Sequence, residues 1–334
     1  MTAILTRPFD AALAWKGADM LKSDVWLYRF SERALEEIDR AVESVKASKL
    51  APHQITKEAF PLPSLARDLE RIADELENGR GFVQMKGLRF TDESEAELIF
   101  WGISVHVGRA IPQNPQGELI GHVRDEGLDI RNGNVRAYQT RVSQPFHTDI
   151  GGDVVGLMCI RGAQSGGKSR VTSALAVYNA LLTRYPHHVG LLYKGYDVDW
   201  RGEQPEGAPP TYREPIYAYV EGKLMCRFSP RFIRTAQEKT GIRLSTVEEE
   251  AMSAVQELAE ELCFEIQFDA GDIQYINNLA ILHGRTGYED YSEPERRRHL
   301  LRVWLNVPGA RRLPPEFASG PARTGIAVRK ERAL

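Results

Sequence analysis

Apolar residues at intervals of three and four predict two amphipathic helices near the N-terminus. Their buried positions are Leu35, Ile38, Val42 and Val45 behind the candidate cap Ser31, and then Leu65, Leu69, Ile72 and Leu76. A strand is expected over residues 81–85. A third helix should begin at Asp92, with Glu95 placed three residues later as a capping-box partner. Residues 1–80 therefore form a helical prelude to the rest of the chain.

From about residue 135 the pattern changes to short apolar runs that are separated by glycine and proline. These runs have the length of strands and cover residues 154–160, 216–220, 264–268, 273–276 and 300–305. Many short strands joined by turns are typical of a sandwich or barrel. Two helices interrupt them, one over residues 173–184 and one that begins at Ser245 with Glu248 as its capping partner. The expected fold class is mainly β with flanking helices.

Two later segments do not follow this pattern of short apolar runs. Residues 202–215 hold four prolines and read as a long, lid-like loop. After Pro308 the chain becomes basic and contains further proline and glycine, which predicts a loosely held tail over residues 307–334. We therefore expect a single catalytic domain over residues 1–334, with its β-rich core at residues 81–306.

Composition limits the class of protein. With 42% apolar and 27% charged residues among 334, the chain is that of an ordinary soluble domain. A formal net charge of −3 gives no general attraction to nucleic acid or to an anionic membrane. We find no signal peptide and no apolar run of the roughly 18 residues that a membrane helix needs. Three widely spaced cysteines argue against a disulfide framework, so a cytoplasmic location is the expectation.

One pattern of possible metal ligands stands out. His147 and Asp149 are two residues apart, so on a strand their side chains share a face. His283 lies near the end of a second strand-like run. Two histidines and one aspartate that leave open positions are the ligand set of non-haem Fe(II) oxygenases. A lone His-x-Asp is nevertheless common by chance, and a surface pair or a structural histidine explains most cases. The other histidines have no carboxylate at a useful spacing and are expected to be structural.

A strand over residues 298–305 follows His283. Its alternation places Arg298, Leu300, Arg302 and Trp304 on one face. An inward guanidinium is costly unless it meets an anion, and its planar fork suits a carboxylate. The competing interpretation is a solvated charge in a basic run. Further polar residues near strand ends could line a substrate pocket, although such residues more often bond to the backbone. They are Asn134, Tyr138, Gln139, Asn277, Arg285, Arg302 and Trp304.

Four segments together resemble the TauD/TfdA family of Fe(II)- and 2-oxoglutarate-dependent oxygenases. They are residues 146–149 (FHTD), residues 166–169 (GGKS) leading into 174–181, residues 271–285, and residues 298–302 (RHLLR). Each motif is weak alone, but their order and spacing agree over about residues 81–306. The resemblance implies a double-stranded β-helix, or jelly roll, with helices packed outside.

The resemblance also implies roles for individual residues. His147, Asp149 and His283 would be the iron ligands. Arg298, helped by Ser169, would hold the distal carboxylate of the cosubstrate 2-oxoglutarate. Arg302 occupies a position that in some relatives contacts an anionic substrate group, or it could support the cosubstrate site. The implied reaction uses O2 to oxidise a C–H bond and releases succinate and CO2. Since family members often oligomerise, a homo-oligomer is a further expectation.

Two other classes of function stay open at this point. A metal-dependent hydrolase or isomerase could use the same three ligands without 2-oxoglutarate, and it would not need Arg298 or Ser169. A non-catalytic jelly-roll binding module would not need the three ligands. The polar and cationic pocket candidates favour a small polar substrate, such as an amino acid or a natural-product intermediate. No nucleic-acid or membrane partner is expected.

Overall fold

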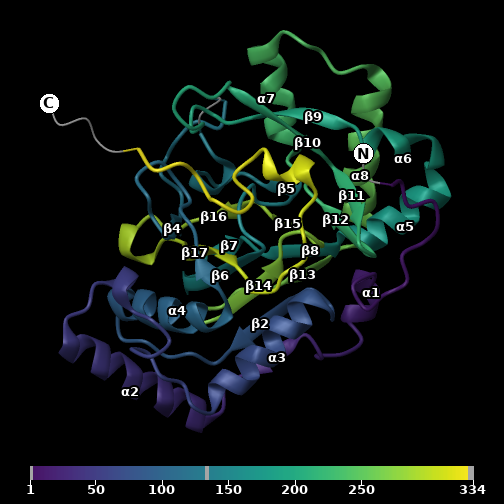
Figure 1. Ribbon diagram of the computed structural model, residues 1–334. Helices are drawn as coiled ribbons and strands as arrows, with labels where there is room; N and C mark the ends of the chain where they lie inside the picture. Colours follow the sequence, from purple (N-terminus) through teal and green to yellow (C-terminus); the bar gives the residue numbers. More distant parts are fainter. Residues whose placement is uncertain (1–2, 132–134, 330–334) are drawn as a thin grey trace, which may run out of the picture.

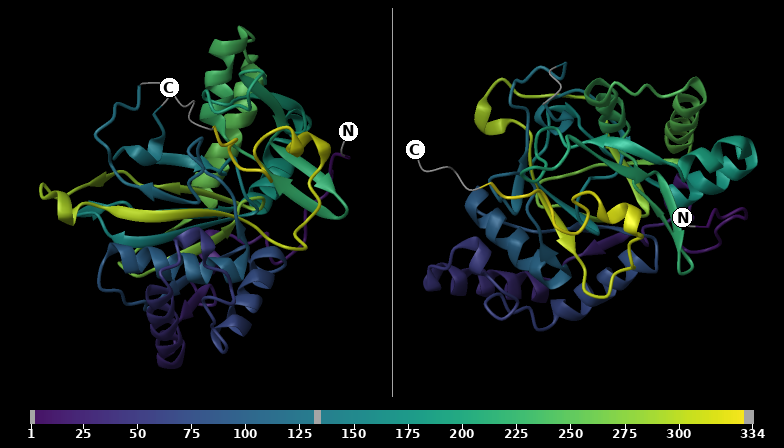
Figure 2. Two further views of the ribbon diagram at one scale, coloured as in Figure 1. Left: turned by 60° about the vertical axis from the view of Figure 1, so that its left-hand side comes forward. Right: turned by 45° about the horizontal axis from the view of Figure 1, so that its top comes forward.

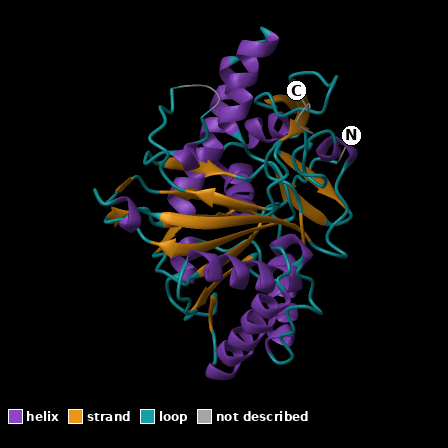
Figure 3. Cartoon of the chain, turned by 90° about the vertical axis from the view of Figure 1, so that its left-hand side faces the viewer, coloured by secondary structure: helices purple, strands orange, loops and turns teal. Residues whose placement is uncertain are grey.

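Two β-sheets occupy the centre of the molecule, and helices cover both outer sides (Figures 1 and 3). The computed structural model describes residues 3–131 and 135–329. The larger sheet has the order β1-β2-β14-β6-β17-β3, and β4 also pairs with β17. Its strands are β1 (Leu27–Arg29), β2 (Phe82–Lys86), β3 (Arg109–Ala110), β4 (Ile120–Val123), β6 (Val154–Arg161), β14 (Ile273–Asn277) and β17 (His299–Asn306).

The smaller sheet has the order β13-β8-β15-β5. Its strands are β5 (Gln144–His147), β8 (Ser169–Ser173), β13 (Phe264–Ile266) and β15 (Ile281–Arg285). Apolar side chains from both sheets form one buried cluster, to which Val155 and Trp304 contribute from the larger sheet and Val171 and Ile281 from the smaller. Two sheets packed face to face through alternating inward residues are the jelly roll that the sequence predicted.

The N-terminal helices cover the outer face of the larger sheet. These helices are α2 (Glu32–Ser48), α3 (Leu65–Glu77) and α4 (Glu93–Val107), whereas α1 (Gly17–Met20) packs beside β13 of the smaller sheet. All eight predicted apolar positions of α2 and α3 are buried, and all eight join one core with the larger sheet. Ser31 accepts the Ala34 N–H as predicted, a cap worth about 1 kcal/mol. At α4, Asp92 accepts from the Glu95 N–H, but the Glu95 carboxylate bonds to Thr91 and so does not complete the box.

A second group of helices covers the smaller sheet, and Figure 2 shows them on the side opposite the N-terminal helices. They are α5 (Ala174–Arg184), α6 (Pro186–Leu192), α7 (Pro230–Thr240) and α8 (Thr246–Leu262). The capping box of Ser245 and Glu248 is present at α8 as predicted. The sequence reading missed α6 and α7. Both begin with proline, which suits the first helical position but also resembles a loop signal.

Three short strand pairs complete the fold and correct one expectation. They are β7 (Ser165–Gly166) with β16 (Tyr288–Glu289), β9 (Gly195–Asp199) with β10 (Thr211–Pro215), and β11 (Tyr217–Val220) with β12 (Lys223–Cys226). Because β10 occupies the last five residues of the expected loop at 202–215, the irregular segment is shorter than predicted.

The segment after Pro308 is not loosely held over its described part. Phe317 and Ile326 are buried in the domain, and the buried Arg311 forms an ion pair with Glu77 of α3. Because the segment is basic overall, the few apolar residues that fix it to the domain were not recognised in the sequence. None of the described helices combines the length and hydropathy that a membrane span needs.

Candidate metal centre and active site

The two candidate histidine ligands face each other across neighbouring strands. His147 on β5 and His283 on β15 are direct partners in the antiparallel register, and their ring centroids are 4.3 Å apart. Opposite residues of an antiparallel pair project to the same side of the sheet. Asp149 follows β5 by two residues and therefore lies on that side as well. Strand pairing thus brings together residues that are more than 130 positions apart in the sequence.

The geometry of these three side chains fits a single metal ion. Oδ1 of Asp149 lies 3.7 Å from Nε2 of His147 and 3.8 Å from Nε2 of His283. One ligand atom from each residue lies within 4.8 Å of the other two. Two ligands bound at about 2.1 Å to one ion can be up to about 4.2 Å apart, so both measured distances allow a shared ion. The remaining sides of such an ion would be open to smaller ligands.

Neighbouring groups orient two of the three ligands. Nδ1 of His147 lies 2.9 Å from the Pro145 carbonyl, so this nitrogen carries the proton and Nε2 is left as the ligand. Oδ2 of Asp149 accepts from Trp304 Nε1 at 2.6 Å and from Arg302 Nη1 at 3.2 Å, which leaves Oδ1 for the ion. The Gln144 amide also lies 2.9 Å from Nε2 of His147, and it must turn aside when an ion binds there.

The protonation states suit metal binding. Burial and the neighbouring His147 lower the pKa of His283 to about 3, so its imidazole is neutral at physiological pH. Burial alone would raise the pKa of Asp149, but Arg302 and the two histidines outweigh it and hold that pKa below its usual range. A carboxylate and a neutral imidazole are the forms that bind a cation.

Two buried residues that were not predicted from the sequence form hydrogen bonds with the backbone around Asp149. The Asn278 side chain accepts from the Asp149 N–H at 2.8 Å and donates to the Asp149 carbonyl at 2.8 Å. The same amide nitrogen bonds to two glycine carbonyls just beyond. Arg227 donates to the carbonyls of Asp149 and Ile150 at 3.0 and 2.6 Å. Both residues are distant in sequence and carry no motif, so only the folded structure reveals them.

A narrow cavity of about 60 Å³ extends from the metal ligands towards Arg298. Its lining includes His147, His283, Ser169 and Arg298. Arg298 is buried, and its Nη1 has no hydrogen-bond partner among the described residues. Burial lowers the pKa of this guanidinium, and the opposing effects of Tyr288, Cys159 and Asp290 do not offset it. A buried cation with an unpaired donor in a cavity at the metal ligands fits a carboxylate of 2-oxoglutarate. The Ser169 hydroxyl lines the same cavity and donates to Gln274 at 2.8 Å.

The predicted substrate-pocket residues divide into three groups. Tyr138, Arg302 and Trp304 line a second, larger cavity at the metal centre. The side chain of Gln139 instead caps the Arg136 N–H and bonds to Glu126, and Asn277 donates to the Leu76 carbonyl at the end of α3. These two therefore satisfy local polar groups and do not reach the cavity, which corrects the prediction.

The remaining candidates are placed as follows. Asn134 lies outside the described residues. Arg285 lines the narrow cavity, where it donates to the Thr140 and Val142 carbonyls.

The larger cavity has a volume of about 600 Å³ and is lined by His147 and Asp149, while Arg298 is not among its lining residues. Apolar side chains such as Phe228 and Met252 line part of it, and residues from η2 (Ala137–Gln139), β5, α7 and α8 form its walls. A cavity of this size and mixed lining is typical of a small-molecule site. Three arginines that line this cavity were not predicted from the sequence. They are Arg136, Arg201 and Arg231, and they come from three separate segments.

A second group of possible metal ligands lies on the other face of β17. It consists of Glu93, His122 and His299. Here Nδ1 of His122 and Nε2 of His299 bond to each other at 2.9 Å, and His299 Nδ1 lies 3.2 Å from Glu93. The guanidinium of Arg161 lies 3.4 Å from the same carboxylate. The ligand atoms are thus engaged with one another beside a cation, so we assign this group a structural role, as the sequence predicted for its histidines.

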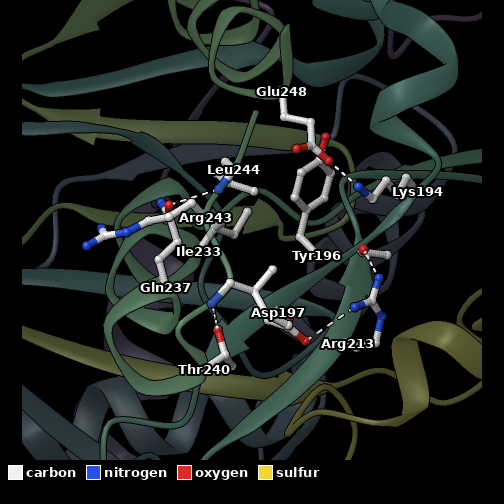
Figure 4. Close-up of a pocket in the computed structure, with 12 residues that line it drawn as sticks. Lys194, Tyr196, Asp197, Arg213, Ile233, Gln237, Thr240, Arg243, Leu244 and Glu248 are labelled. Atoms are coloured by element: carbon white, nitrogen blue, oxygen red, sulfur yellow. Dashed lines mark hydrogen bonds and ion pairs between the residues drawn. The ribbon is translucent and has the colours of Figure 1, made fainter. Parts of the chain in front are cut away.

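A small cavity of about 90 Å³ lies among β9, α7 and the start of α8 (Figure 4). Its charged side chains pair within the wall, Lys194 with Glu248 and Arg213 with Asp197. It contains none of the three candidate metal ligands. We assign it no role in the chemistry.

Comparison with known proteins supports the geometric interpretation. Residues 46–304 match the family model described as taurine catabolism dioxygenase TauD, TfdA family. FR-33289 synthase from Streptomyces rubellomurinus is 31% identical over 327 residues, which cover 96% of each chain. The taurine hydroxylase-like protein SAT17 from Stachybotrys chartarum is 30% identical over 317 residues, which cover 91% of this chain and 81% of that protein.

Two solved oxygenases share the fold. A crystal structure of asparagine oxygenase has a TM-score of 0.65 at 15% identity and covers 90% of this chain and 99% of its own. The non-haem iron oxygenase OrfP, in complex with Fe and α-ketoglutaric acid, has a TM-score of 0.58 at 16% identity, with 84% and 94% covered. The family match spans most of the chain, and the geometry of the candidate ligands and of the adjoining cavity is compatible with this chemistry. The chain therefore belongs to the TauD/TfdA family and, with it, to the Fe(II)- and 2-oxoglutarate-dependent dioxygenases.

Proposed function

We propose that this enzyme hydroxylates an unactivated C–H bond of a small polar molecule, of the class of amino acids and natural-product intermediates. The observation that carries the proposal is that two cavities share the candidate ligands His147 and Asp149, and that His283 lines one of them. One cavity is narrow and ends at the buried Arg298, and the other is ten times larger. A cosubstrate and a substrate can thus each reach the same metal ion through a separate cavity.

Each proposed residue has a defined task. His147, Asp149 and His283 hold the ion, and Arg298 with Ser169 receives the distal carboxylate of 2-oxoglutarate. Trp304 and Arg302 keep Asp149 ionised and fixed in orientation. When bound, Fe(II) and 2-oxoglutarate supply the oxidising chemistry, in which O2 converts the cosubstrate to succinate and CO2 and oxidises the substrate. The walls of the larger cavity orient the C–H bond and exclude water from it.

The names of similar proteins support a substrate of this size. Asparagine oxygenase has been crystallised with a hydroxyasparagine and succinate, and OrfP with hydroxylated arginines. The relative from Streptomyces rubellomurinus is named a synthase of FR-33289. These compounds are named for the similar proteins, and for this chain they only guide the choice of compounds for a first screen.

The test is a substrate screen that measures succinate release and O2 consumption together. We expect succinate to form in proportion to a hydroxylated product, and only when Fe(II) and 2-oxoglutarate are both present. The rival hydrolase or isomerase would turn over its substrate without 2-oxoglutarate or O2. Arg298→Gln separates the two, since it should abolish succinate release by the oxygenase but leave a hydrolase intact. Turnover that persists without 2-oxoglutarate would overturn the proposal.

A further inference from the structure

Two buried guanidinium groups line the narrow cavity at the candidate metal ligands. Arg285 is the last residue of β15, and Arg298 directly precedes β17, so the two sheets each contribute one of them. Both line the cavity of about 60 Å³ that His147 and His283 also line. Each arginine is only 5% exposed. Because water no longer solvates these cations, they need hydrogen-bond acceptors or an anion in its place.

The protein supplies acceptors for only part of this pair. Nη2 of Arg285 donates to the Thr140 carbonyl at 2.9 Å and also to the Val142 carbonyl. Nε and Nη1 of Arg285 and Nη1 of Arg298 are buried, and they have no hydrogen-bond partner among the described residues. Both guanidinium groups can therefore donate to a ligand in the cavity that they share.

Acidic residues of the described chain do not neutralise the two charges through salt bridges. Asp290 accepts from the backbone N–H of Arg298 at 2.8 Å, and Asp125 pairs with Arg141 at 2.9 Å. Two cations that line one narrow, buried cavity repel each other. A carboxylate bound between them would relieve this repulsion and accept from both, since the planar guanidinium is shaped for two parallel bonds to a carboxylate.

The ring of Tyr288 keeps both guanidinium groups in place. Cζ of Arg285 lies 4.6 Å from the ring centroid, and Cζ of Arg298 lies 5.1 Å from it. Such contacts between a cation and an aromatic face are attractive. Gly167 closes against the same group: its φ is 68°, and a Cβ there would lie 3.1 Å from Nε of Arg298 and 3.4 Å from Cβ of Tyr288. Glycine thus allows the turn to approach this closely, which restricts the movement of the two cations.

We propose that Arg285 is a second cosubstrate-binding residue, which donates together with Arg298 to the distal carboxylate of 2-oxoglutarate, and that Tyr288 is a positioning residue for both. The pocket then selects a dicarboxylic 2-oxo acid, because a 2-oxo acid without the distal carboxylate leaves two buried cations unpaired. This inference rests on the proposed function, since it concerns the same cosubstrate site.

The test is a calorimetric titration of the Fe(II)-loaded protein in the absence of O2, with 2-oxoglutarate and with 2-oxovalerate. These compounds have the same chain length, and a methyl group replaces the distal carboxylate in 2-oxovalerate. The ratio of their two dissociation constants measures the preference for the dicarboxylate. Arg285→Gln should lower this preference about tenfold or more, with little change in the affinity for 2-oxovalerate. If Arg285 acted only through the Thr140 and Val142 carbonyls, both compounds would bind more weakly to the same extent, and the proposal would fail.

A comparison of single and double variants tests whether both arginines hold the carboxylate. Arg285→Gln and Arg298→Gln should each keep part of the preference for the dicarboxylate, and the double variant should lose it. If Arg298→Gln alone removes the whole preference, Arg285 does not bind the carboxylate and the proposal is overturned. Arg285→Lys keeps the charge and should retain part of the preference.

The matched control is Arg311→Gln. Arg311 is also a buried guanidinium that donates to a backbone carbonyl, that of Leu224, but it lines neither cavity at the candidate ligands. This variant should keep the full preference for 2-oxoglutarate. An equal loss of preference in Arg311→Gln and Arg285→Gln would show that any buried arginine has this effect, which contradicts the assignment.

A further variant guards against a folding defect, which circular-dichroism melting of each protein detects. If Arg285→Gln does not fold, Tyr288→Leu decides, because it removes the aromatic face but neither charge. We expect this variant to lower the preference for the dicarboxylate about threefold or more, again with little effect on 2-oxovalerate. An unchanged preference in the folded variant would contradict the positioning role.

The outcomes separate this inference from the proposed function. If a substrate drives succinate release but Arg285→Gln keeps the full preference for 2-oxoglutarate, the oxygenase stands and the role of Arg285 is wrong. If the preference depends on Arg285 but no small polar molecule is hydroxylated, the cosubstrate site stands and the proposed hydroxylation fails.

Discussion

Trp304 and Asp149 are joined by a hydrogen bond of 2.6 Å between the indole nitrogen and the carboxylate oxygen that faces away from the histidines. Arg302 bonds to the same oxygen from the same face of β17. Through these two donors the larger sheet fixes a metal ligand that the smaller sheet presents. The metal centre is therefore a product of the packing between the sheets, and a change in β17 should alter it.

The first prediction concerns this bond. Trp304→Phe keeps most of the buried ring but removes the donor, so Asp149 should lose part of its fixed orientation. Supporting groups of this kind are worth about 10–100-fold in metal affinity, and we expect a loss of that size in a Co(II) titration of the variant. Trp101→Phe is the control, because Trp101 donates to the Ile55 carbonyl far from the site. An equal loss in both variants would show that the bond has no special role.

The second prediction concerns Asn278. Its fully buried amide holds the backbone of Asp149 and of the two glycines that follow. Asn278→Ala leaves several buried backbone groups without partners, each of which costs about 1–3 kcal/mol. We expect a lower free energy of unfolding in urea and a loss of metal binding at temperatures where the variant is still folded. Retention of full metal affinity in the folded variant would mean that other contacts suffice to place Asp149.

Comparison of the sequence with the fold shows where prediction succeeded. Alternation along β17 correctly placed Arg298, Leu300 and Arg302 on one face, since strand periodicity needs no knowledge of the partner strands. The capped helices α2 and α8 were likewise visible, because caps and apolar stripes are local signals. That His147 and His283 share one site was expected from their ligand chemistry and then from the family resemblance, and the strand register now explains how they meet.

Other features depended on contacts that no local pattern records. Asn278, Arg227 and the cavity arginines act through partners that are distant in sequence, so each looked like an ordinary polar residue. Asn277 was misread for the same reason, because it donates to the distant Leu76 carbonyl, whereas Gln139 was misread because its side chain accepts from the local Arg136 N–H. The described part of the tail was misread because its basic composition outweighed two buried anchors, Phe317 and Ile326.

The third prediction tests the cosubstrate site. Arg298→Gln removes the buried cation whose Nη1 has no hydrogen-bond partner in the described part of the chain. The affinity of the Fe(II)-loaded protein for 2-oxoglutarate should fall by about tenfold to a hundredfold, the value of a strong charge-assisted bond. Metal affinity should be unchanged, as measured by calorimetry without O2. Arg297→Gln, an exposed neighbour that bonds to the Tyr291 and Ser292 carbonyls, is the control and should bind 2-oxoglutarate normally.

The fourth prediction is a dependence of stability on pH. The Lys194 hydrogen bond, with help from Ser245, lowers the pKa of Glu248 from 4.5 to about 2. A depressed carboxyl pKa stabilises the fold above pH 4.5, and this stabilisation disappears as the pH falls towards 2. Glu248→Gln should therefore cost about 1–2 kcal/mol in the free energy of unfolding at pH 7, and this cost should decrease steadily as the pH falls through 4.5 towards 2. Glu250→Gln, on the exposed side of α8, should show no such trend in parallel urea titrations.

The most direct test of the account is an anomalous-scattering map, recorded at the iron edge, from crystals grown with Fe(II) and 2-oxoglutarate without O2. We predict one strong peak about 2.0–2.2 Å from Nε2 of His147, Oδ1 of Asp149 and Nε2 of His283. A peak among Glu93, His122 and His299 instead, or the absence of a peak at the predicted position, would contradict the assignment of the metal centre.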